Sequence, residues 1–444
     1  MKKFTTVIVW LRNDLRLHDN EALARAVRDA DEVLPVYCFD DRQFATTSLG
    51  FPKTGAVRAQ FLRESVEDTQ AALRSRGADL LIRRGLPEII LPSLAREIAA
   101  QAVYFHEEVT DEELVVEQAL VEALSKTLVN NSPVQDVSFW GSTLHHLNDI
   151  PFNTEQLPDV FTHFRKDVEK KSKVRAIFPT PQAITLPSAF SRLPQQEIPS
   201  LQDLCPTSDL PTPDSRAVLP FKGGETQALK RLADYFWERD CLKNYKETRN
   251  GLIGADYSSK FSAWLALGCL SPRFVFAEVQ RYERERVTND STYWLVFELL
   301  WRDFFRFTAR KYDTALFRAS GIMNVKRSWN LDWKAFERWK TGTTGVPFVD
   351  ANMRELLLTG FMSNRGRQNV ASYLVKDMKL HWHMGAEWFE SQLVDYDVCS
   401  NYGNWNYAAG IGNDPREDRY FNIPKQASMY DPQGDYVRRW LEQK

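Results

Sequence analysis

Hydrophobic and polar positions follow one pattern in the first third of the chain, where short apolar runs alternate with amphipathic segments. Strands are predicted at residues 4–10, 33–39, 79–85, 101–107 and 136–141. Helices are predicted at residues 20–30, 57–77, 88–100 and 111–127. Asn20 is expected to cap the first helix and Gly77 to end the second. Strands that alternate with helices predict an α/β fold with a doubly wound, mostly parallel sheet.

A second pattern begins after Gly224, where apolar positions recur at helical spacing. Helices are predicted at residues 225–240, 259–270, 292–312, 348–360 and 386–397, with almost no strand signal. Between the two parts, residues 178–221 are rich in Pro, Ser and Gln and predict a long linker that crosses the surface. We expect an α/β domain over residues 1–135, a connector over 136–222 and an all-helical (all-α) domain over 223–444.

Composition agrees with more than one folded domain. The chain has 444 residues, which exceeds what one core usually fills, and 43% hydrophobic with 26% charged residues is typical of a soluble globular protein. A net charge of −2 excludes a generally basic nucleic-acid binder but leaves room for a local basic cleft. No run is long and apolar enough for a membrane span, and the basic and apolar N-terminus predicts a first strand rather than a signal peptide.

Cysteine and tryptophan usage adds two points. The five cysteines are scattered without a CxxC pair, which argues against a zinc ribbon or disulfide scaffold and suits a reducing, cytoplasmic location. Thirteen tryptophans are present, and all except Trp10 and Trp140 lie beyond residue 236. A large aromatic core is the simplest explanation of that excess.

Several common site motifs are missing. No GxGxxG follows the first strand, so a Rossmann dinucleotide site is not expected, although a nucleotide-like ligand could still bind at the carboxyl edge of the sheet. Neither a Walker motif nor GxSxG occurs. His381 and His383 are two residues apart without a cysteine partner, so we expect no metal site there.

Residues 359–378 contain the densest group of candidate binding side chains. Asn364, Arg365, Arg367 and Gln368 fall within little more than one helical turn, and Asn364 and Gln368 share a face. Amides hydrogen-bond heteroaromatic edges, and arginines hold phosphates or carboxylates in a forked geometry. The same pattern would also fit an amphipathic helix with a solvated polar face.

A second group lies in the predicted helix 292–312. Glu298, Trp301 and Arg302 occupy positions i, i+3 and i+4, which places them on one face. A carboxylate, an indole and a guanidinium together can bind a nucleobase by its edge and by stacking. The alternative is an ordinary core helix with an ion pair.

Two acidic residues near the C-terminus form a third group. Asp395 and Asp397 precede Asn401 and Trp405, and no third hard ligand follows at a spacing that would suit a metal. One acid could instead pair with Arg367 or accept from a ring N–H.

Serines gather where the predicted helix 259–270 begins. Hydroxyls and free N–H groups at a helix start form a phosphate site. Because serine caps are common, this signal is weak by itself. The serines are Ser258, Ser259 and Ser262.

These segments occur in a familiar order. The runs VIVWLRNDLRLHDNEAL, WRDFFRF, TGFMSNRGRQNVASYLVKDM and DYDVCSNYGNWNYAAGIGNDPREDRYFN, with the terminal YVRRWL, resemble the photolyase/cryptochrome family, most closely its cryptochrome DASH branch. The resemblance covers nearly the whole chain. It implies a photolyase-like, antenna-binding α/β domain joined to an FAD-binding helical domain.

The resemblance also implies roles for residues around the flavin. Arg367 and Asp395 match an ion pair beside the isoalloxazine. Asp397 matches a residue that contacts the flavin ring, and Asn401 matches the residue that faces flavin N5. The positions matching the diphosphate contacts are Tyr245, Ser258, Ser259, Lys260, Phe261 and Ser262.

An electron-transfer chain is implied as well. Trp405, Trp382 and Trp329 match the tryptophans that pass electrons from the surface to photoexcited FAD. Most of the remaining tryptophans are expected to be packing residues.

The implied reaction is blue-light repair of cyclobutane pyrimidine dimers in DNA by electron transfer from reduced flavin. Positions that match the lesion pocket are Glu298, Trp301, Asn364 and Gln368. Positions that match the DNA-binding face are Arg249, Arg302, Arg365, Tyr407 and Gln426.

Two residues depart from the best-known cyclobutane-dimer photolyases. Gln368 replaces a methionine and Tyr407 replaces a second pocket tryptophan, as is typical of the DASH branch. Loss of an indole should weaken stacking on the dimer by ~1–3 kcal/mol per base. Activity is therefore expected mainly on single-stranded or looped DNA. Asn364 and Gln368 leave no pocket histidine pair, which argues against repair of six-four photoproducts.

A light-harvesting antenna is implied for the α/β domain, either 5,10-methenyltetrahydrofolate or a deazaflavin. Glu112 lies near the position where folate-binding relatives carry a carboxylate, although a charged surface residue is the simpler explanation. The protein is expected to be monomeric. One rival function is a photoreceptor that binds nucleic acid without repair. Another is a light-independent flavin oxidoreductase, which has no support because the sequence shows no nicotinamide-binding fingerprint.

Overall fold

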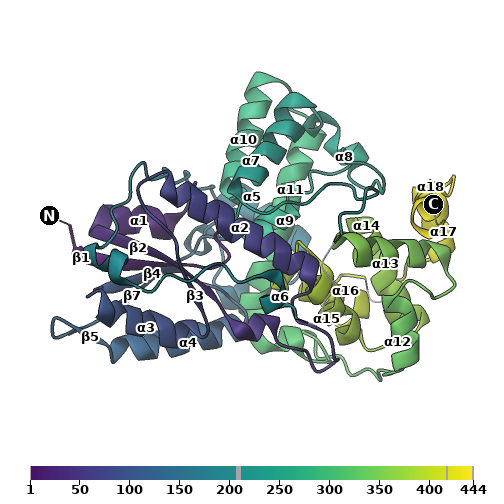
Figure 1. Cartoon of the computed structure of the whole chain (residues 1–444). Coiled ribbons are helices and arrows are strands. Elements are labelled where there is room, and N and C mark those ends of the chain that lie inside the picture. The colour runs from purple at the N-terminus through teal and green to yellow at the C-terminus, as the bar shows by residue number, and fades with distance from the viewer. Residues whose placement is uncertain (1, 207–211, 417–418, 443–444) are drawn as a thin grey trace.

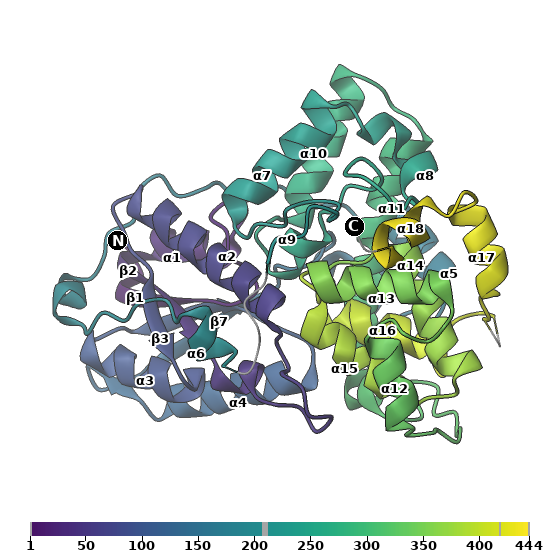
Figure 2. The same ribbon diagram turned by 45° about the vertical axis from the view of Figure 1, so that its right-hand side comes forward.

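A computed structural model describes residues 2–206, 212–416 and 419–442. The chain forms an α/β unit and a helical unit that lie side by side, and α2 runs along the first unit toward the second (Figures 1 and 2). Within the described ranges, no helix combines the length and apolarity needed to cross a membrane.

A five-stranded parallel sheet forms the centre of the α/β unit. Its order is β3-β2-β1-β4-β7, so the first strand lies in the middle and is buried along almost its whole length, as the run FTTVIVWL requires. The strands are β1 Phe4–Leu11, β2 Ala30–Phe39, β3 Leu81–Arg84, β4 Ala102–His106 and β7 Gln135–Phe139. Strands β5 Leu128–Val129 and β6 Ser132–Pro133 form a small separate hairpin.

Four helices cover the sheet, α1 and α2 on one side and α3 and α4 on the other (Figure 1). The doubly wound prediction is therefore confirmed. Asn20 caps α1, because its side chain accepts a hydrogen bond from the Leu23 amide at 3.0 Å. The helices are α1 Glu21–Asp29, α2 Ala56–Arg74, α3 Pro87–Glu97 and α4 Asp111–Ser125. Helix α2 ends at Arg74, three residues before the predicted Gly77.

The described part of the connector contains two α-helices that the sequence pattern did not indicate. Helix α5 (Phe161–Lys171) packs on α11 through Phe161 and Phe164. A short helix α6 (Leu201–Leu204) and a 3₁₀ turn at Ser188–Arg192 follow. Residues 207–211 of the predicted linker lie outside the described ranges.

The rest of the described chain is helical. The helices are α7 Glu225–Ala233, α8 Tyr245–Thr248, α9 Ser262–Ala266, α10 Pro272–Glu285, α11 Asp290–Tyr312, α12 Trp333–Lys340, α13 Pro347–Thr359, α14 Asn364–Ser372, α15 Trp382–Gln392, α16 Val398–Ala409, α17 Ile423–Tyr430 and α18 Asp435–Leu441. π-Helical turns extend α7 and α14 over Asp234–Glu238 and Tyr373–Asp377.

Two predicted helices are shorter than expected. The helix predicted over 259–270 covers only α9, because Ser258 and Lys260 before it adopt left-handed backbone at φ 55° and 60°. The helix predicted over 386–397 begins at Trp382 and ends at Gln392. The chain leaves the helix there, and Asp395 then faces Ser262 and Arg367.

The loop after β1 joins the two units through buried polar contacts. Arg16 donates to the carbonyl oxygen of Gly268 at 2.8 Å, and His18 Nδ1 lies 2.6 Å from Glu225 Oε1. Asp19 accepts from Arg273 at 2.7 and 2.9 Å. All of these side chains are buried, and their hydrogen bonds offset the cost of removing them from water.

Gly268 allows this loop to approach the helical unit. A Cβ there would lie 2.0 Å from the Asn13 carbonyl oxygen and 2.6 Å from the Asp14 Cα, and its φ is 64°. Neighbouring Leu267 accepts from the Leu15 amide at 3.1 Å. Only glycine tolerates both the backbone angle and the contact.

Helix α11 makes a second set of interdomain contacts. Asp303 accepts from the amides of Leu144 and His145 at 2.8 and 2.9 Å, and buried Arg306 pairs with Glu108. The relative position of the two units is therefore fixed from several directions.

We predict that Asp19→Ala lowers the free energy of unfolding by about 3–5 kcal/mol, because it leaves Arg273 buried without a partner. Asp167→Ala is the matched control, since it removes an ion pair with Lys171 at the surface that is worth about 0.5 kcal/mol. Urea unfolding of both variants measures the difference. Equal losses would contradict the structural role given to Asp19.

Candidate functional site

A cavity of about 480 Å³ opens within the helical unit, a volume in the range of about 300–1,000 Å³ that ligand sites occupy. It brings together predicted residues from segments far apart in the sequence. Those that line it are Tyr245, Arg249, Ser258, Ser259, Lys260, Phe261, Ser262, Glu298, Trp301, Arg302, Asn364, Arg365, Arg367, Gln368, Asp395, Asp397, Asn401, Trp405 and Tyr407. We call this the helical-domain cavity.

An ion pair lies on the wall of the helical-domain cavity. Both Asp395 oxygens lie 2.9 Å from Arg367 Nη2, and the Ser262 hydroxyl donates to Asp395 at 2.6 Å. Arg367 Nε donates to the carbonyl oxygen of Met362 at 2.9 Å, which leaves part of the guanidinium edge for a ligand. The Asp395 side chain is buried, so this pair is held rigidly.

The loop before α9 forms another part of the wall, and buried Arg231 holds it from behind. Arg231 donates to the carbonyl oxygens of Ser259 at 3.1 Å and Ala255 at 2.8 Å. Lys260 points inward, where its ammonium donates to the carbonyl oxygens of Ala255 and Tyr257. Burial, together with the charge of Arg231, lowers the pKa of Lys260 well below its usual value.

Asp397 and Asn401 belong to the start of α16. Asp397 caps the helix by accepting from the backbone amide of Ser400 at 2.8 Å. The side-chain Nδ2 of Asn401 donates to the Ala386 carbonyl oxygen at 3.0 Å. Burial opposes ionisation of Asp397, but the charge of Arg302 and the hydrogen bond from Ser400 lower its pKa below the ordinary value.

Arg302 lies deeper than its predicted place on a DNA-binding face suggests. Its guanidinium donates to the carbonyl oxygens of Ser142 and Leu265, the latter at 3.1 Å, and lies 3.9 Å from Asp397. These contacts place Arg302 in the partition between the helical-domain cavity and a second cavity described below.

Glu298 and Trp301 share a face of α11, as their spacing predicts. Glu298 pairs with Arg249, and burial raises the pKa of the Glu298 carboxyl despite that positive charge. Phe161 of the connector stacks on the Trp301 indole, with centroids 3.6 Å apart and an interplanar angle of 11°. One indole face is therefore covered, and the edge of Tyr407 meets the same ring at 6.2 Å.

The start of α14 supplies the amide side chains. Asn364 is exposed, whereas the Gln368 oxygen accepts from Arg365 at 2.9 Å. Arg365 also donates to Asn250 at 3.1 Å and lies 4.5 Å from the Tyr430 ring. Arg365 is therefore fixed by three neighbours at the mouth of the helical-domain cavity.

The charge and polarity of this lining suit an anionic, polar aromatic ligand. Its described residues include six lysine and arginine side chains but only three carboxylates. The cationic ones are Arg249, Lys260, Arg302, Arg365, Arg367 and Arg419, and the carboxylates are Glu298, Asp395 and Asp397. The excess of positive charge arises although the chain as a whole carries −2.

Buried polar atoms without partners point to the same kind of ligand. Tyr257 Oη, Arg365 Nε and Tyr407 Oη have no hydrogen-bond partner among the described residues. Burying such atoms unpaired is costly, so a bound polar ligand would offset that cost. These residues fit a nucleotide cofactor with an aromatic ring system and a diphosphate.

The three predicted electron-transfer tryptophans run from this lining toward the surface. Trp405 lines the helical-domain cavity, Trp382 is fully buried at the start of α15, and Trp329 is half-buried. A Cβ on Gly385 would lie 2.1 Å from the Trp405 ring, so that ring rests against α15 one turn beyond Trp382. Trp382 and Trp329 both donate to the Ala319 carbonyl oxygen, at 3.3 and 3.1 Å, which makes them neighbours.

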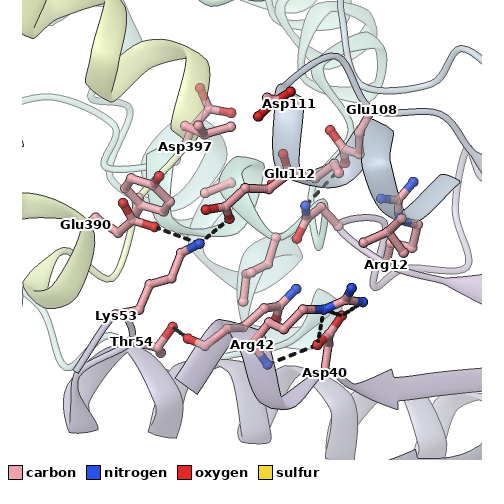
Figure 3. Close-up of a pocket in the computed structure, with 18 of the residues that line it drawn as sticks. Arg12, Asp40, Arg42, Lys53, Thr54, Glu108, Asp111, Glu112, Glu390 and Asp397 are labelled. Atoms are coloured by element: carbon pink, nitrogen blue, oxygen red, sulfur yellow. Dashed lines mark hydrogen bonds and ion pairs between the residues drawn. The ribbon is translucent and has the colours of Figure 1, made fainter. Parts of the chain in front are cut away.

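Two predicted residues lie elsewhere. Gln426 is half-buried on α17, outside this lining. Glu112 is exposed on α4 and lines a second cavity of about 750 Å³ between the α/β and helical units, where it pairs with Lys53 (Figure 3). We call this the interdomain cavity; Arg302 and Asp397 line both cavities.

Sequence patterns alone did not identify several residues of the site. Phe161 lies in a segment without a clear periodic pattern, and Arg231 contacts a loop 28 residues away. Asn250 and Tyr257 line the helical-domain cavity from an irregular segment. The one available signal was their proximity in sequence to Arg249 and Ser258.

A buried acid lies behind the site. Glu355 of α13 accepts from the Tyr436 hydroxyl of α18 at 2.6 Å, and its other oxygen has no partner among the described residues. Burial raises the pKa of Glu355 to about 8, although Tyr436 and the charge of Lys260 favour the carboxylate. We therefore expect Glu355 to be protonated at neutral pH.

An α/β sheet unit joined to a helical unit with such a cavity defines a photolyase-type flavoprotein. A family model for DNA photolyase matches residues 7–183, and one for the FAD binding domain of DNA photolyase matches residues 294–443. The chain belongs to the photolyase/cryptochrome family, in its cryptochrome DASH branch, and carries the FAD-binding domain of that family.

Individual proteins and structures that resemble this chain support the same family. The chain is 57% identical to Cryptochrome DASH of Gloeobacter violaceus over 98% of its length and 85% of that protein, and 57% identical to Cryptochrome DASH of Synechocystis sp. over 98% and 87%. The crystal structure of the Synechocystis cryptochrome superposes with a TM-score of 0.94 at 55% identity, covering 99% of this chain and 89% of that one. A class III photolyase from Agrobacterium tumefaciens gives 0.82 at 31% identity, covering 99% and 87%.

We predict that Glu355→Gln changes the pH dependence of stability. Between pH ~5 and 8 the folded protein keeps a proton on Glu355 that the unfolded chain, with an ordinary pKa near 4.5, releases. Wild-type stability should therefore fall as pH rises through that window, by up to a few kcal/mol, and the variant should lack this component. Urea unfolding at a series of pH values measures it. Parallel profiles would contradict a raised pKa.

Proposed function

We propose that this protein is a blue-light-driven DNA photolyase that repairs cyclobutane pyrimidine dimers, mainly in single-stranded or looped DNA. The observation that supports this most is the lining of one cavity. Glu298, Trp301 and the α14 amides share that lining with the Arg367–Asp395 pair. When bound and reduced, FAD would supply the light-driven one-electron chemistry that splitting the dimer needs.

The chain's own residues would bind and orient the two partners. In this proposal, Arg367 and the loop over Ser258 and Ser259 hold the cofactor, and Asn401 faces its ring. Glu298 lines the same cavity and would hydrogen-bond the edge of a thymine. That hydrogen bond would stabilise the charge that develops on the dimer.

The shape of the stacking surface supports the proposed preference for single strands. Phe161 covers one face of Trp301, and the Tyr407 ring lies at 78° to the indole and offers no second indole for stacking. Less stacking energy is then available for flipping a dimer out of a duplex, which costs a few kcal/mol. A single-stranded dimer avoids most of that cost.

A light-harvesting antenna cofactor is also proposed. The interdomain cavity, with Glu112 and Lys53 on its wall, would hold methenyltetrahydrofolate or a deazaflavin. An archaeal photolyase from Sulfolobus tokodaii, whose fold superposes with a TM-score of 0.80 at 25% identity, was solved with two FAD molecules. We also propose a monomer located in the cytoplasm, in keeping with five cysteines that are all free.

The second candidate function is a blue-light photoreceptor that binds nucleic acid without repair. The Arg249–Glu298 pair favours it, because the carboxyl group is already engaged in the absence of DNA. The two candidates differ in one measurable outcome, which is loss of dimers under light.

We predict that the purified, FAD-loaded and photoreduced protein repairs a single dimer faster in a single-stranded oligomer than in the matched duplex. Glu298→Ala should lower repair per absorbed photon about tenfold or more, since a hydrogen bond to a charged group is worth about 1.5–3 kcal/mol. Glu298→Gln keeps a donor and should recover part of the loss. Chromatography of the illuminated oligomers measures the dimer content.

Three results would count against the proposal. Equal rates on both substrates would contradict the single-strand preference. Normal flavin photoreduction without any repair would favour the photoreceptor. A preparation that emerges colourless and takes up no added FAD would contradict both functions.

A further inference from the structure

Tyr402 lies beside the middle tryptophan of the predicted electron-transfer chain. It belongs to α16, one turn before Trp405, and its ring meets the Trp382 ring at 6.0 Å and 80°. The Tyr402 side chain is buried, and Phe317 packs against it at 4.8 Å. A phenol this close to an indole can exchange an electron with it.

The two tryptophans themselves have no acidic or basic partner for their protons. The N–H groups of Trp382 and Trp329 both donate to the Ala319 carbonyl oxygen. A backbone carbonyl accepts a hydrogen bond but is too weak a base to take the proton. His383 packs against the Trp382 ring at 4.0 Å, but the indole N–H points to Ala319 instead. Oxidised Trp382 would therefore remain a cation.

Tyr402 does have a base within reach. Its hydroxyl donates to Glu390 Oε2 at 3.2 Å, inside the distance over which a carboxylate can accept a proton. Lys53 Nζ lies 3.9 Å from the other side of Glu390, and Figure 3 shows Lys53 between Glu390 and Glu112.

The surrounding charges decide which form Glu390 takes. Burial raises the pKa of Glu390, while Lys53 and Arg58 favour its ionised form and Glu112 opposes it. If Glu390 takes up a proton, the half-buried ammonium of Lys53 keeps Glu112 as a partner.

We propose that Tyr402 is a redox-active side chain that donates an electron to oxidised Trp382 while its phenolic proton moves to Glu390. The step converts a Trp382 cation radical, neutral tyrosine and a carboxylate into neutral tryptophan, a neutral tyrosyl radical and a carboxylic acid. Charge, atoms and electrons balance. The oxidant that first removes an electron, by way of Trp405, is photoexcited oxidised flavin, so the inference rests on the proposed function.

This branch would compete with transfer from Trp329. The neutral tyrosyl radical cannot take its electron back from Trp382 unless Glu390 also gives the proton back. The hole is then held at a buried site, next to the interdomain cavity that Tyr402 also lines. Photoreduction should therefore persist when Trp329 is removed.

The test uses the full-length, FAD-loaded protein with four variants. These are Trp329→Phe, Trp329→Phe combined with Tyr402→Phe, Trp329→Phe combined with Glu390→Gln, and Trp329→Phe combined with Tyr312→Phe. Tyr312 is the matched control, because its hydroxyl also donates to a carboxylate, Asp159 at 2.5 Å. Time-resolved electron paramagnetic resonance after blue flashes, with and without ring-deuterated tyrosine, identifies the radical.

Trp329→Phe should retain photoreduction and show a radical whose spectrum narrows when tyrosine is deuterated. Adding Tyr402→Phe should abolish that radical. Adding Glu390→Gln should lower its rate of formation about a hundredfold, the typical contribution of a positioned base. Adding Tyr312→Phe should change neither radical nor yield.

The contrary outcomes separate this inference from the proposed function. Flavin photoreduction with tryptophan radicals alone, or a tyrosine signal that survives Tyr402→Phe, overturns the role of Tyr402 and leaves the photolyase proposal intact. A flavin-free protein, or bound flavin whose oxidised absorption does not bleach under light, overturns both.

Discussion

The buried ion pair between Asp19 and Arg273 fixes how the two halves of the molecule meet. It forms because the loop after β1 turns at Asp19, whose φ is 45°, and inserts its polar side chains between the sheet and α10. Nearly every hydrogen-bonding group of Arg16 ends on a backbone carbonyl, so the loop cannot shift without leaving a buried charge unpaired. A contact with such strict geometric demands behaves as a fixed joint rather than as a flexible interface.

Both cavities depend on that joint. Arg302 on α11 reaches across it to the Ser142 carbonyl oxygen of the connector and also approaches Asp397. Ala266, Arg302, Tyr396 and Asp397 line the helical-domain cavity and the interdomain cavity alike. The two spaces are therefore separated by a single layer of side chains. A change in the domain angle would move that layer and alter both cavities together.

Features that depend on residues close together in the sequence were predictable, and features that depend on residues far apart in the sequence were not. The sheet, its flanking helices and the cap at Asn20 follow from local periodicity and were predictable. The end of α15 at Gln392 was not, because AEWFESQLVDYD keeps its helical pattern beyond the residue where the chain turns. Arg302 shows the same limit in the site. Its position on the face of Glu298 was correct, but its inward hydrogen bonds come from segments 37 and 160 residues away.

The helical-domain cavity gathers more cationic side chains than anionic ones. Its described lining contains six lysine and arginine side chains and three carboxylates. Lys260 is buried deeply enough that its pKa falls well below normal. In the absence of a ligand these groups repel one another and are partly desolvated, which lowers the stability of the helical unit. An anionic ligand that binds only the folded form reverses that cost and adds stability in proportion to the logarithm of its concentration. Relief of that repulsion is therefore one contribution to the affinity for such a ligand.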